Sequence, residues 1–382
     1  MKIHRRLTNW LETHWVTPAY SGWLMGGLAV FFFAAATNTL AGWLYVISGV
    51  MFALLVVGAV LPERSLHGMR ITRRPIAPVS VDETLVVELD LENITRQPKT
   101  LLQVQDLLPV ELGPPERKAI EVIPAQATYH WLYEYPTHRR GIYRWQTVQM
   151  RTATPLGLFW CRRDQSVKAI AVVYPKVLPL NQCPLIDEMG REVNARVQSA
   201  YRAQGATEGV TRTLRPYRWG DPTRLVHWRT SARYGELRVR ELETFTGGQE
   251  IVICLDSAIA WHHDDFEQAV MAAASLYFYA VQNKLEVSLW TAGTGSLKGR
   301  QAVLEALAAT QAGELPRAER LPELPLVWLT PNGSSLNALP GGSRWVFWPG
   351  SGRNAKTPLN SEFSGLVVQS DQSLQLQLQA PV

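Results

Sequence analysis

The sequence predicts three structural parts: two amino-terminal transmembrane helices, an all-β sandwich, and an α/β domain with a doubly wound parallel sheet. No charged residue occurs between Tyr20 and Leu61. Polar and apolar residues then alternate from Val79 onward, and strand-like runs alternate with helical segments after Gly247. We place the tail and helical hairpin at residues 1–67, the sandwich at 68–175, an arginine-rich connecting element at 176–246, and the α/β domain with its tail at 247–382.

The uncharged stretch is too long for one membrane span, and it is broken at Thr37, Asn38 and Thr39. Its two apolar runs, of roughly 18 and 22 residues, each approach the length that crosses a bilayer. The doubled hydrophobic block and the lack of an A-x-A cleavage pattern disfavour a signal peptide. Because basic residues flank both ends of the hairpin, the positive-inside rule places the soluble domains in the cytoplasm. These flanking residues are Lys2, Arg5, Arg6, Arg64, Arg70, Arg73 and Arg74.

The middle region shows the period of half-buried antiparallel strands, with Leu85, Val87, Leu89 and Leu91 on one side of the pleat. Several further short strands at regular spacing, separated by Pro and Gly, predict a β-sandwich. We find no catalytic spacing here and expect a structural or interaction role. The segment Thr154–Trp160 is interpreted as a buried hydrophobic turn, with a functional loop as the alternative.

An arginine-rich stretch occupies Thr211–Phe245. Asp221 followed by Pro222 predicts a helix start, since the aspartate caps a free N–H and proline has none. Gly235 predicts its end. We expect an apolar stripe at Leu225, Trp228 and Ala232, a polar face at Arg224, His227 and Ser231, and a strand in which Leu237 and Val239 alternate with Arg238 and Arg240.

This element is interpreted as the joint between the two soluble domains, with its polar face free to contact a partner. We therefore expect Trp228→Ala to destabilise the junction, and His227→Ala to weaken partner binding without unfolding. The partner-binding candidates are Arg215, Tyr217, Gly220, Asp221, Arg224, His227, Trp228, Arg229, Ser231 and Arg233.

The carboxy-terminal region contains buried strands that alternate with helices, and ligands of such sheets usually bind beyond the carboxyl ends of the strands. Those ends are Asp256, residues 291–295 and residues 330–333. The tail from Ser370 is rich in Gln, Leu and Ser, and we expect it to be poorly ordered.

A net charge of +5 suits an anionic lipid surface or acidic partners, but it is too small to indicate nucleic-acid binding. Cys161, Cys183 and Cys254 lie far apart in the chain, without a CxxC or a nearby histidine pattern. This spacing favours neither a zinc site nor a disulfide framework.

The motif RPYRWGDPTRLVHWRTSARYGELRVRELE, with HRRGIYRWQTVQMRTATPLGLF upstream and the strand that ends at Asp256, resembles the bacterial family called domain of unknown function fifty-eight. The likeness covers essentially the whole chain. It implies a protein of the bacterial plasma membrane with an Ig-like sandwich and a von Willebrand A-like domain. Members often accompany MoxR-type AAA+ ATPases, and no enzymatic activity is established for them.

Von Willebrand A domains commonly hold Mg²⁺ through Asp-x-Ser-x-Ser, a threonine and a second aspartate, since hard cations need oxygen ligands. Here Asp256 remains, but Ala258 and Ala260 replace the two hydroxyls, and Pro331 or Asn332 stands where the aspartate is expected. We therefore predict that the metal site is lost, and we assign no metal or cofactor.

Three functions compete. The first is a non-enzymatic, membrane-tethered scaffold or adaptor, with a MoxR-type ATPase as the partner that the resemblance implies. The second is a hydrolase that uses His227 with Asp221 or Asp256. The third is an anionic-lipid or nucleic-acid binder that uses the arginines, which suit phosphate. Carboxylates that pair with the arginines disfavour the third function; they are Asp221, Glu236, Glu241 and Glu243.

Overall fold

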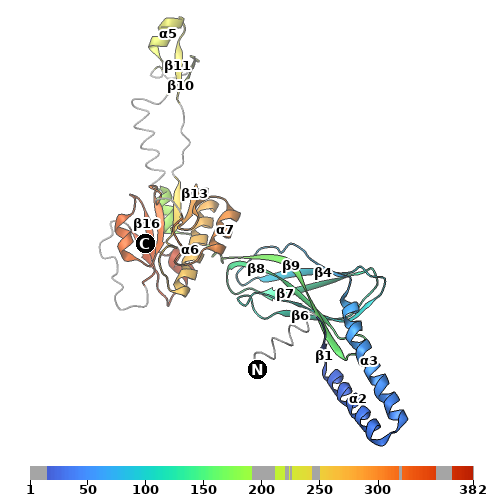
Figure 1. Ribbon diagram of the computed structural model, residues 1–382. Coiled ribbons are helices and arrows are strands. Elements are labelled where there is room, and N and C mark those ends of the chain that lie inside the picture. Colours follow the sequence, from blue (N-terminus) through green and yellow to red (C-terminus); the bar gives the residue numbers. More distant parts are fainter. Residues whose placement is uncertain are drawn as a thin grey trace. The chain divides into compact units, whose positions relative to one another are not determined.

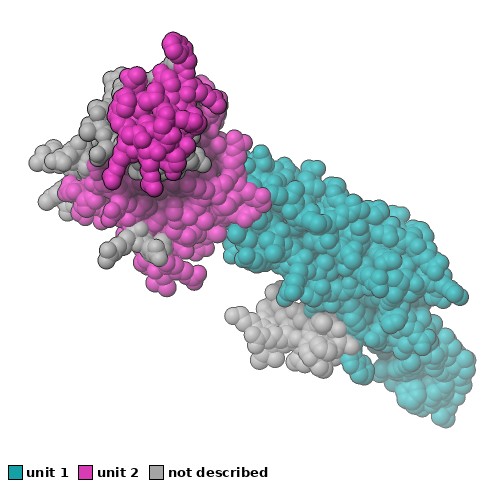
Figure 2. All heavy atoms as spheres, turned by 90° about the horizontal axis from the view of Figure 1, so that it is seen from above, with its two compact units in different colours: residues 1–174 teal, residues 175–382 magenta. Residues whose placement is uncertain are grey.

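The computed structural model describes residues 15–191, 211–219, 223, 226–242, 250–317, 321–349 and 364–381. The chain divides into two compact units, residues 1–174 and residues 175–382 (Figure 2). Each unit is described by itself below.

The first unit begins with two long helices, α2 at Tyr20–Thr39 and α3 at Gly42–Leu66 (Figure 1). Both are long and apolar enough to cross a membrane. They lie side by side, and Ser48 Oγ donates to the Ala29 carbonyl over 2.9 Å. The predicted break at 37–39 falls slightly early, because α2 continues to Thr39 and ends at Leu40 in the left-handed conformation.

The predicted hydrophobic turn at Thr154–Trp160 packs against the start of the transmembrane hairpin. The Leu158 carbonyl accepts from the main-chain N–H of Ala19 over 2.8 Å, and the Gly157 carbonyl accepts from Ser21 Oγ over 2.6 Å. A Cβ at Gly22 would overlap the Leu158 oxygen, so only glycine permits this approach. The hairpin and the β-sheets are therefore packed together as one unit.

Two β-sheets complete the first unit, and all of their strands except β1 follow the hairpin. One has the order β1-β9-β8-β5-β6, with β3 also paired to β9, and the other has the order β2-β4-β7. The strands are β1 Thr17–Pro18, β2 Met69–Arg73, β3 Val79–Ser80, β4 Thr84–Asn93, β5 Lys99–Asp106, β6 Glu116–Ile123, β7 Thr128–Pro136, β8 Gly141–Thr152 and β9 Phe159–Tyr174.

The predicted alternation in β4 is confirmed, since Leu85, Val87, Leu89 and Leu91 are all buried. They join side chains from both sheets in one apolar cluster. The period of two therefore marks the face that each strand turns toward the core.

A charged pair lies inside this core. Asp106 is fully buried, and its carboxylate accepts from Arg73 over 2.8 and 3.0 Å, from Tyr133 Oη over 2.8 Å and from Trp145 Nε1 over 3.0 Å. The Arg73 guanidinium also lies 4.9 Å from the Trp145 ring centroid. Four donor contacts offset the cost of removing this carboxylate from water.

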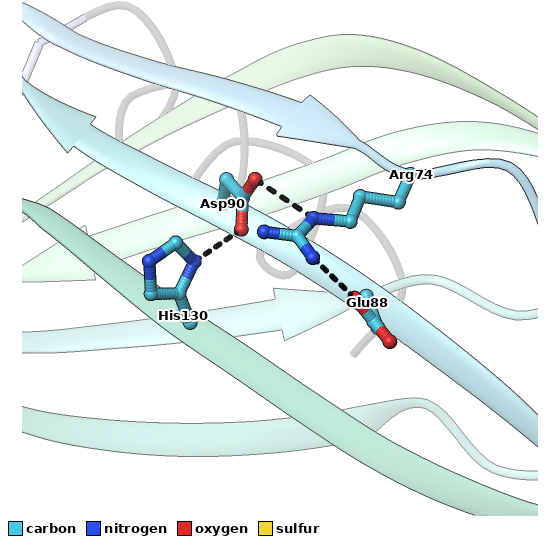
Figure 3. A network of polar contacts seen from close by, with 4 residues as sticks. All are labelled: Arg74, Glu88, Asp90 and His130. Atoms are coloured by element: carbon cyan, nitrogen blue, oxygen red, sulfur yellow. Dashed lines mark hydrogen bonds and ion pairs between the residues drawn. The ribbon is translucent and has the colours of Figure 1, made fainter.

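A second polar network lies on the outer side of the three-stranded sheet (Figure 3). Asp90 accepts from Arg74 over 3.2 Å, and its other oxygen lies 2.6 Å from His130 Nδ1. Arg74 also donates to Glu88 over 3.0 Å. The hydrogen bond with His130, helped by Arg74, holds the pKa of Asp90 below its ordinary value.

This network predicts a pH-dependent contribution to stability. A depressed carboxylate pKa stabilises the fold above the unfolded pKa of about 3.9, and that stabilisation is lost as the pH falls through the folded value. We expect His130→Ala to raise the Asp90 pKa toward its ordinary value. An NMR titration of the Asp90 carboxyl carbon measures the shift, with the exposed His138→Ala as the control. An unchanged Asp90 titration in His130→Ala would contradict the assignment.

The second unit contains a six-stranded sheet with the order β14-β13-β12-β15-β16-β17, parallel except at β14. Its elements are β12 Ile251–Leu255, α6 His263–Gln282, β13 Val287–Thr291, β14 Gly295–Leu297, α7 Arg300–Ala309, β15 Leu326–Thr330, the 3₁₀ helix η2 Gly333–Ala338, β16 Arg344–Phe347, β17 Gly365–Val367 and α8 Leu374–Gln379. The predicted buried runs are thus confirmed as strands of this sheet, with β17 at its edge.

The two faces of this sheet are covered differently. Buried side chains of α6, α7 and α8 all join the cluster on one face. The opposite cluster contains Trp328, Trp345 and Phe347 and is joined by Leu336 of η2. Within the described part of the chain, the α-helices therefore pack on one face, whereas the sequence predicts a doubly wound sheet with helices on both.

Two segments extend this core beyond its predicted limits. Residues 184–191 are helical, and Leu185, Ile186 and Met189 are buried in the core although the sequence places them in the connecting element. The expectation of a poorly ordered tail is wrong, because Leu374 and Leu378 of α8 pack into the same core. These contacts join residues far apart in sequence, so local composition does not indicate them.

Candidate functional site

The arginine-rich stretch forms a small element of its own, which we call the module and define as the described residues within 211–242. Strand β10, Thr211–Pro216, pairs antiparallel with β11, Arg238–Leu242. The helix α5, Trp228–Tyr234, lies between them in sequence. Gly235 ends α5 in the left-handed conformation at φ 71°, as its position predicts.

The predicted helix start, at Asp221 and Pro222, lies outside the described residues. Val226 forms a bridge with Val239, and His227 has non-helical angles, so α5 begins at Trp228. His227 is the N-cap: its Nδ1 accepts from the Thr230 main-chain N–H over 3.2 Å and also contacts Thr230 Oγ1. An imidazole nitrogen thus fills the role that the sequence assigns to a carboxylate.

Ser231 is buried in the module. Its Oγ donates to the His227 carbonyl over 3.1 Å and accepts from the Arg238 main-chain N–H over 2.8 Å, which ties α5 to β11. The polar face predicted at His227 and Ser231 therefore holds the module together. This corrects the prediction that these two side chains present a free surface to a partner.

The predicted apolar stripe is also wrong where it can be examined. Trp228 is 66% exposed, Ala232 is exposed, and Leu225 lies outside the described residues. Trp219, absent from the sequence-based candidates, is 100% exposed. The sequence could have indicated Trp219 as a binding residue, because it stands next to Tyr217 and Arg218 in the motif. Tryptophan, tyrosine and arginine are enriched among the residues that contribute most to binding in protein interfaces.

The remaining candidates divide into exposed and half-buried positions. Arg229 and Arg233 are exposed on α5, whereas Arg215 and Tyr217 are half-buried. Arg215 donates to the Pro216 carbonyl over 3.3 Å, and the Tyr217 N–H donates to the Leu237 carbonyl over 2.8 Å. Gly220, Asp221 and Arg224 lie outside the described residues.

The module has few buried side chains of its own. Val226 and Val239 are buried at 5% and 2% exposure, and Ser231 lies beside them. In contrast, Tyr234 is 58% exposed, with the Arg238 guanidinium 4.4 Å from its ring centroid. Among its described side chains, the module thus presents aromatic rings and arginines around a small buried cluster.

The second candidate region lies at the carboxyl ends of β12 and β15, where the strand order reverses. Asp256 follows β12, and its Oδ2 accepts from Thr330 Oγ1 over 2.8 Å. Burial raises the pKa of Asp256 above its ordinary value, while the Thr330 hydrogen bond opposes that shift. The two predicted strand ends therefore meet, as their positions at a switch point imply.

The other positions of the predicted degenerate metal site point to a structural use. Ala258 and Ala260 are exposed. Asn332 Oδ1 accepts from the Ser334 main-chain N–H over 3.1 Å and caps η2. Among the described residues, no group of three or more His, Cys, Asp or Glu side chains is placed to hold a metal ion.

Comparison with solved structures finds distant likenesses. The CARDB domain of a Pyrococcus furiosus protein is 11% identical, with 27% of this chain and 93% of that chain covered at a TM-score of 0.19. The alkylpurine DNA glycosylase AlkC of Pseudomonas fluorescens is 13% identical, with 36% and 40% covered at a TM-score of 0.20. Scores this low carry no argument about function.

The family comparison is more informative. No curated protein matches the chain. A family model described as protein of unknown function DUF58 matches residues 213–321. This match spans most of the module, β12, α6, β13, β14 and α7. The chain therefore carries a DUF58 region at residues 213–321, the family that its arginine-rich motif resembles.

Proposed function

We propose that this protein is a membrane-anchored, non-enzymatic scaffold that binds an acidic protein partner through the module. The observation that carries the proposal is the exposure of Trp219 and Trp228 on an element whose buried apolar side chains, among those described, are Val226 and Val239. Buried tryptophans supply much of the binding energy of protein interfaces, and so small a core gains stability when a partner covers its aromatic rings.

Charge indicates the chemistry of the partner. Arg218, Arg229 and Arg233 are exposed on the module, and Glu236 is its exposed carboxylate among the described residues. A surface of this sign attracts acidic protein and repels basic protein. The family resemblance suggests a MoxR-type AAA+ ATPase as this partner.

The non-enzymatic part of the proposal rests on how His227 and Ser231 are used. A hydrolase would need the imidazole to face a nucleophile within hydrogen-bond reach. Here Nδ1 of His227 caps α5, and Ser231 Oγ bonds the main chain of His227 and of Arg238 in β11. Both side chains are committed to local structure, which favours a scaffold over the hydrolase alternative.

The finer fold assignments belong to the same proposal. The sandwich is Ig-like, and the α/β domain is von Willebrand A-like and derived from a doubly wound sheet. The strand order supports this: counted from β12, it runs 3-2-1-4-5-6, with an antiparallel third strand at the edge. That order is one of the two common doubly wound arrangements.

The hairpin is the membrane anchor, and the soluble domains face the cytoplasm of a bacterial cell because the hairpin is flanked by basic residues. The three native cysteines are buried, so a cysteine introduced as Glu236→Cys reports its own exposure. We expect a membrane-impermeant maleimide to label this variant only after lysis. Labelling in intact cells would contradict the orientation.

Charge reversal on the module tests the function. We expect the double variant Arg229→Glu, Arg233→Glu to lower partner recovery on the order of tenfold or more, because like charges then face each other. Co-purification from detergent-solubilised membranes measures the recovery. The matched control is Arg117→Glu, Lys118→Glu on the exposed part of β6.

Two results would contradict the proposal. One is equal recovery of the same proteins by the module variant and the control variant. The other is binding of anionic vesicles or nucleic acid, with no protein partner, that is lost steeply with salt. That salt dependence is the mark of phosphate contacts.

A further inference from the structure

The hydrophobic turn at Thr154–Trp160 lies beside the two long helices of the first unit. It connects β8 to β9, and no charged residue occurs between Arg151 and Arg162. The tip of the turn, residues 155–157, is exposed, whereas Leu158 is buried. The contacts of Leu158 therefore show how far along the helices the turn reaches.

Leu158 contacts both helices inside their uncharged stretch. A Cβ built on Gly58 of α3 would lie 3.2 Å from Leu158 Cδ1, and one built on Gly22 of α2 would overlap the Leu158 oxygen. Gly58 lies about one helical turn before Leu61, where the uncharged stretch ends. With the hairpin across a bilayer, Leu158 is therefore at the edge of the hydrocarbon layer.

Polar contacts mark the next level along α3. Ser65 Oγ lies 3.1 Å from Thr154 Oγ1, and Glu63 accepts from Arg163 over 2.8 Å. The turn thus runs along α3 from the charged end of the helix, at Thr154, into its apolar part, at Leu158. The exposed tip of the turn joins these two levels, so it lies where the headgroup layer meets the acyl chains.

Two arginines stand at the base of the turn. Arg151 and Arg162 are directly opposite each other in the register of β8 and β9, and Arg162 also pairs with Asp164 over 3.5 Å. Like charges opposite each other in a sheet are destabilising, so a phosphate bound by both guanidinium groups would offset their repulsion. The Arg151 guanidinium lies 4.2 Å from the centroid of the Trp160 ring, and tryptophan is enriched at the membrane interface.

We propose, building on the membrane anchor proposed above, that the turn inserts Leu156 into the bilayer and that Arg151 and Arg162 bind an anionic phospholipid beside it. An exposed apolar tip next to a basic pair follows the order of acyl chain and phosphate in such a lipid. The sandwich thus contacts the membrane directly and not only through the hairpin.

Fluorescence quenching in vesicles tests the depth of the turn. The full-length protein is reconstituted in phosphatidylcholine with phosphatidylglycerol, and a dye is attached to Leu156→Cys, Val56→Cys or Val110→Cys. The native cysteines are buried, and all three chosen positions are exposed. Lys99, which begins β5, contacts the Arg64 carbonyl of α3 over 3.3 Å, and Val110 follows the far end of this strand.

We expect nitroxides on the acyl chains to quench the dye at positions 156 and 56, and aqueous iodide to quench it only at position 110. Position 56 on α3 separates this inference from the anchor proposal. Quenching by lipid at 56, with iodide quenching at 156 as strong as at 110, would overturn the inference and leave the anchor in place. Iodide quenching at 56 as well would overturn both.

The preference for anionic lipid tests the two arginines. We expect spin-labelled phosphatidylglycerol to associate with the turn, measured by the dye at position 156, at least about fivefold more strongly than spin-labelled phosphatidylcholine, since each arginine near an anionic surface contributes about that factor. Arg151→Gln, Arg162→Gln should remove the preference, and Arg151→Lys, Arg162→Lys should retain it.

The matched control is Arg117→Gln, Lys118→Gln on the exposed part of β6, which should keep the preference. Equal quenching by the two lipids, or an unchanged preference in the Arg151→Gln, Arg162→Gln variant, would overturn the role of the arginines. The comparison of the two lipids decides the question even if the glutamine variant fails to fold, because it needs only the native arginines.

Discussion

Replacing Asp106 by alanine is expected to destabilise the sandwich by about 3–5 kcal/mol, because it leaves a buried arginine without its counter-ion. Arg73 is 2% exposed at its side chain, and both oxygens of Asp106 accept its bonds. Tyr133 and Trp145 lose their acceptor in the same step. The loss is a large part of the 5–15 kcal/mol that typically stabilises a folded domain.

Hydrogen exchange of the amides in β5, β7 and β8 measures this effect within the intact protein, since exchange reports local opening free energy. The matched control is Glu92→Ala. It removes a carboxylate from an exposed pair with Arg70, and the N–O distance of that pair is 3.6 Å. Exposed pairs contribute about 0–1 kcal/mol. Similar protection in the two variants would show that the buried pair contributes no more than the surface pair.

The double variant Trp219→Ala, Trp228→Ala is expected to abolish stable partner binding. Truncation of a central interface tryptophan commonly costs about 2 kcal/mol or more, which is roughly thirtyfold in affinity for each ring. Both rings are exposed, so thermal unfolding of the unbound protein should not change. Leu132→Ala, at a 55% exposed position on β7, is the control.

The module shows which local features the sequence predicts well. Gly235 ends α5 because its position after the helix needs a left-handed residue, and that requirement is readable locally. The roles of His227 and Trp228 are reversed relative to the prediction. Because Val226 forms a bridge with Val239, α5 begins only at Trp228, and a different face of the helix packs on β11.

Long-range contacts account for the features that the sequence does not predict. Leu158 contacts Gly22 across more than a hundred residues, and the sequence near either residue does not predict this contact. Likewise, the sequence shows Gly293 only as a loop glycine, whereas the structure places the Glu314 carboxylate against it. Period and composition determine which face of an element is buried, but they do not determine which loop packs against it.

The carboxyl end of the sheet shows an intermediate case. Strand alternation places Asp256 and Thr330 at neighbouring strand ends, and their 2.8 Å hydrogen bond follows from the parallel register. The raised pKa of Asp256 comes from burial by the surrounding loops, which the strand pattern does not contain. The location of this region was therefore predictable, whereas its electrostatics were not.

Site-specific photo-crosslinking in native membranes tests the scaffold proposal most directly. A photoreactive residue is placed at Trp219, and a control is placed at Val110, which is 90% exposed in the first unit. The proposal predicts one specific protein adduct from position 219 that is absent from position 110 and is lost in the Arg229→Glu, Arg233→Glu background. Adducts to lipid alone, or the same proteins from both positions, would contradict it.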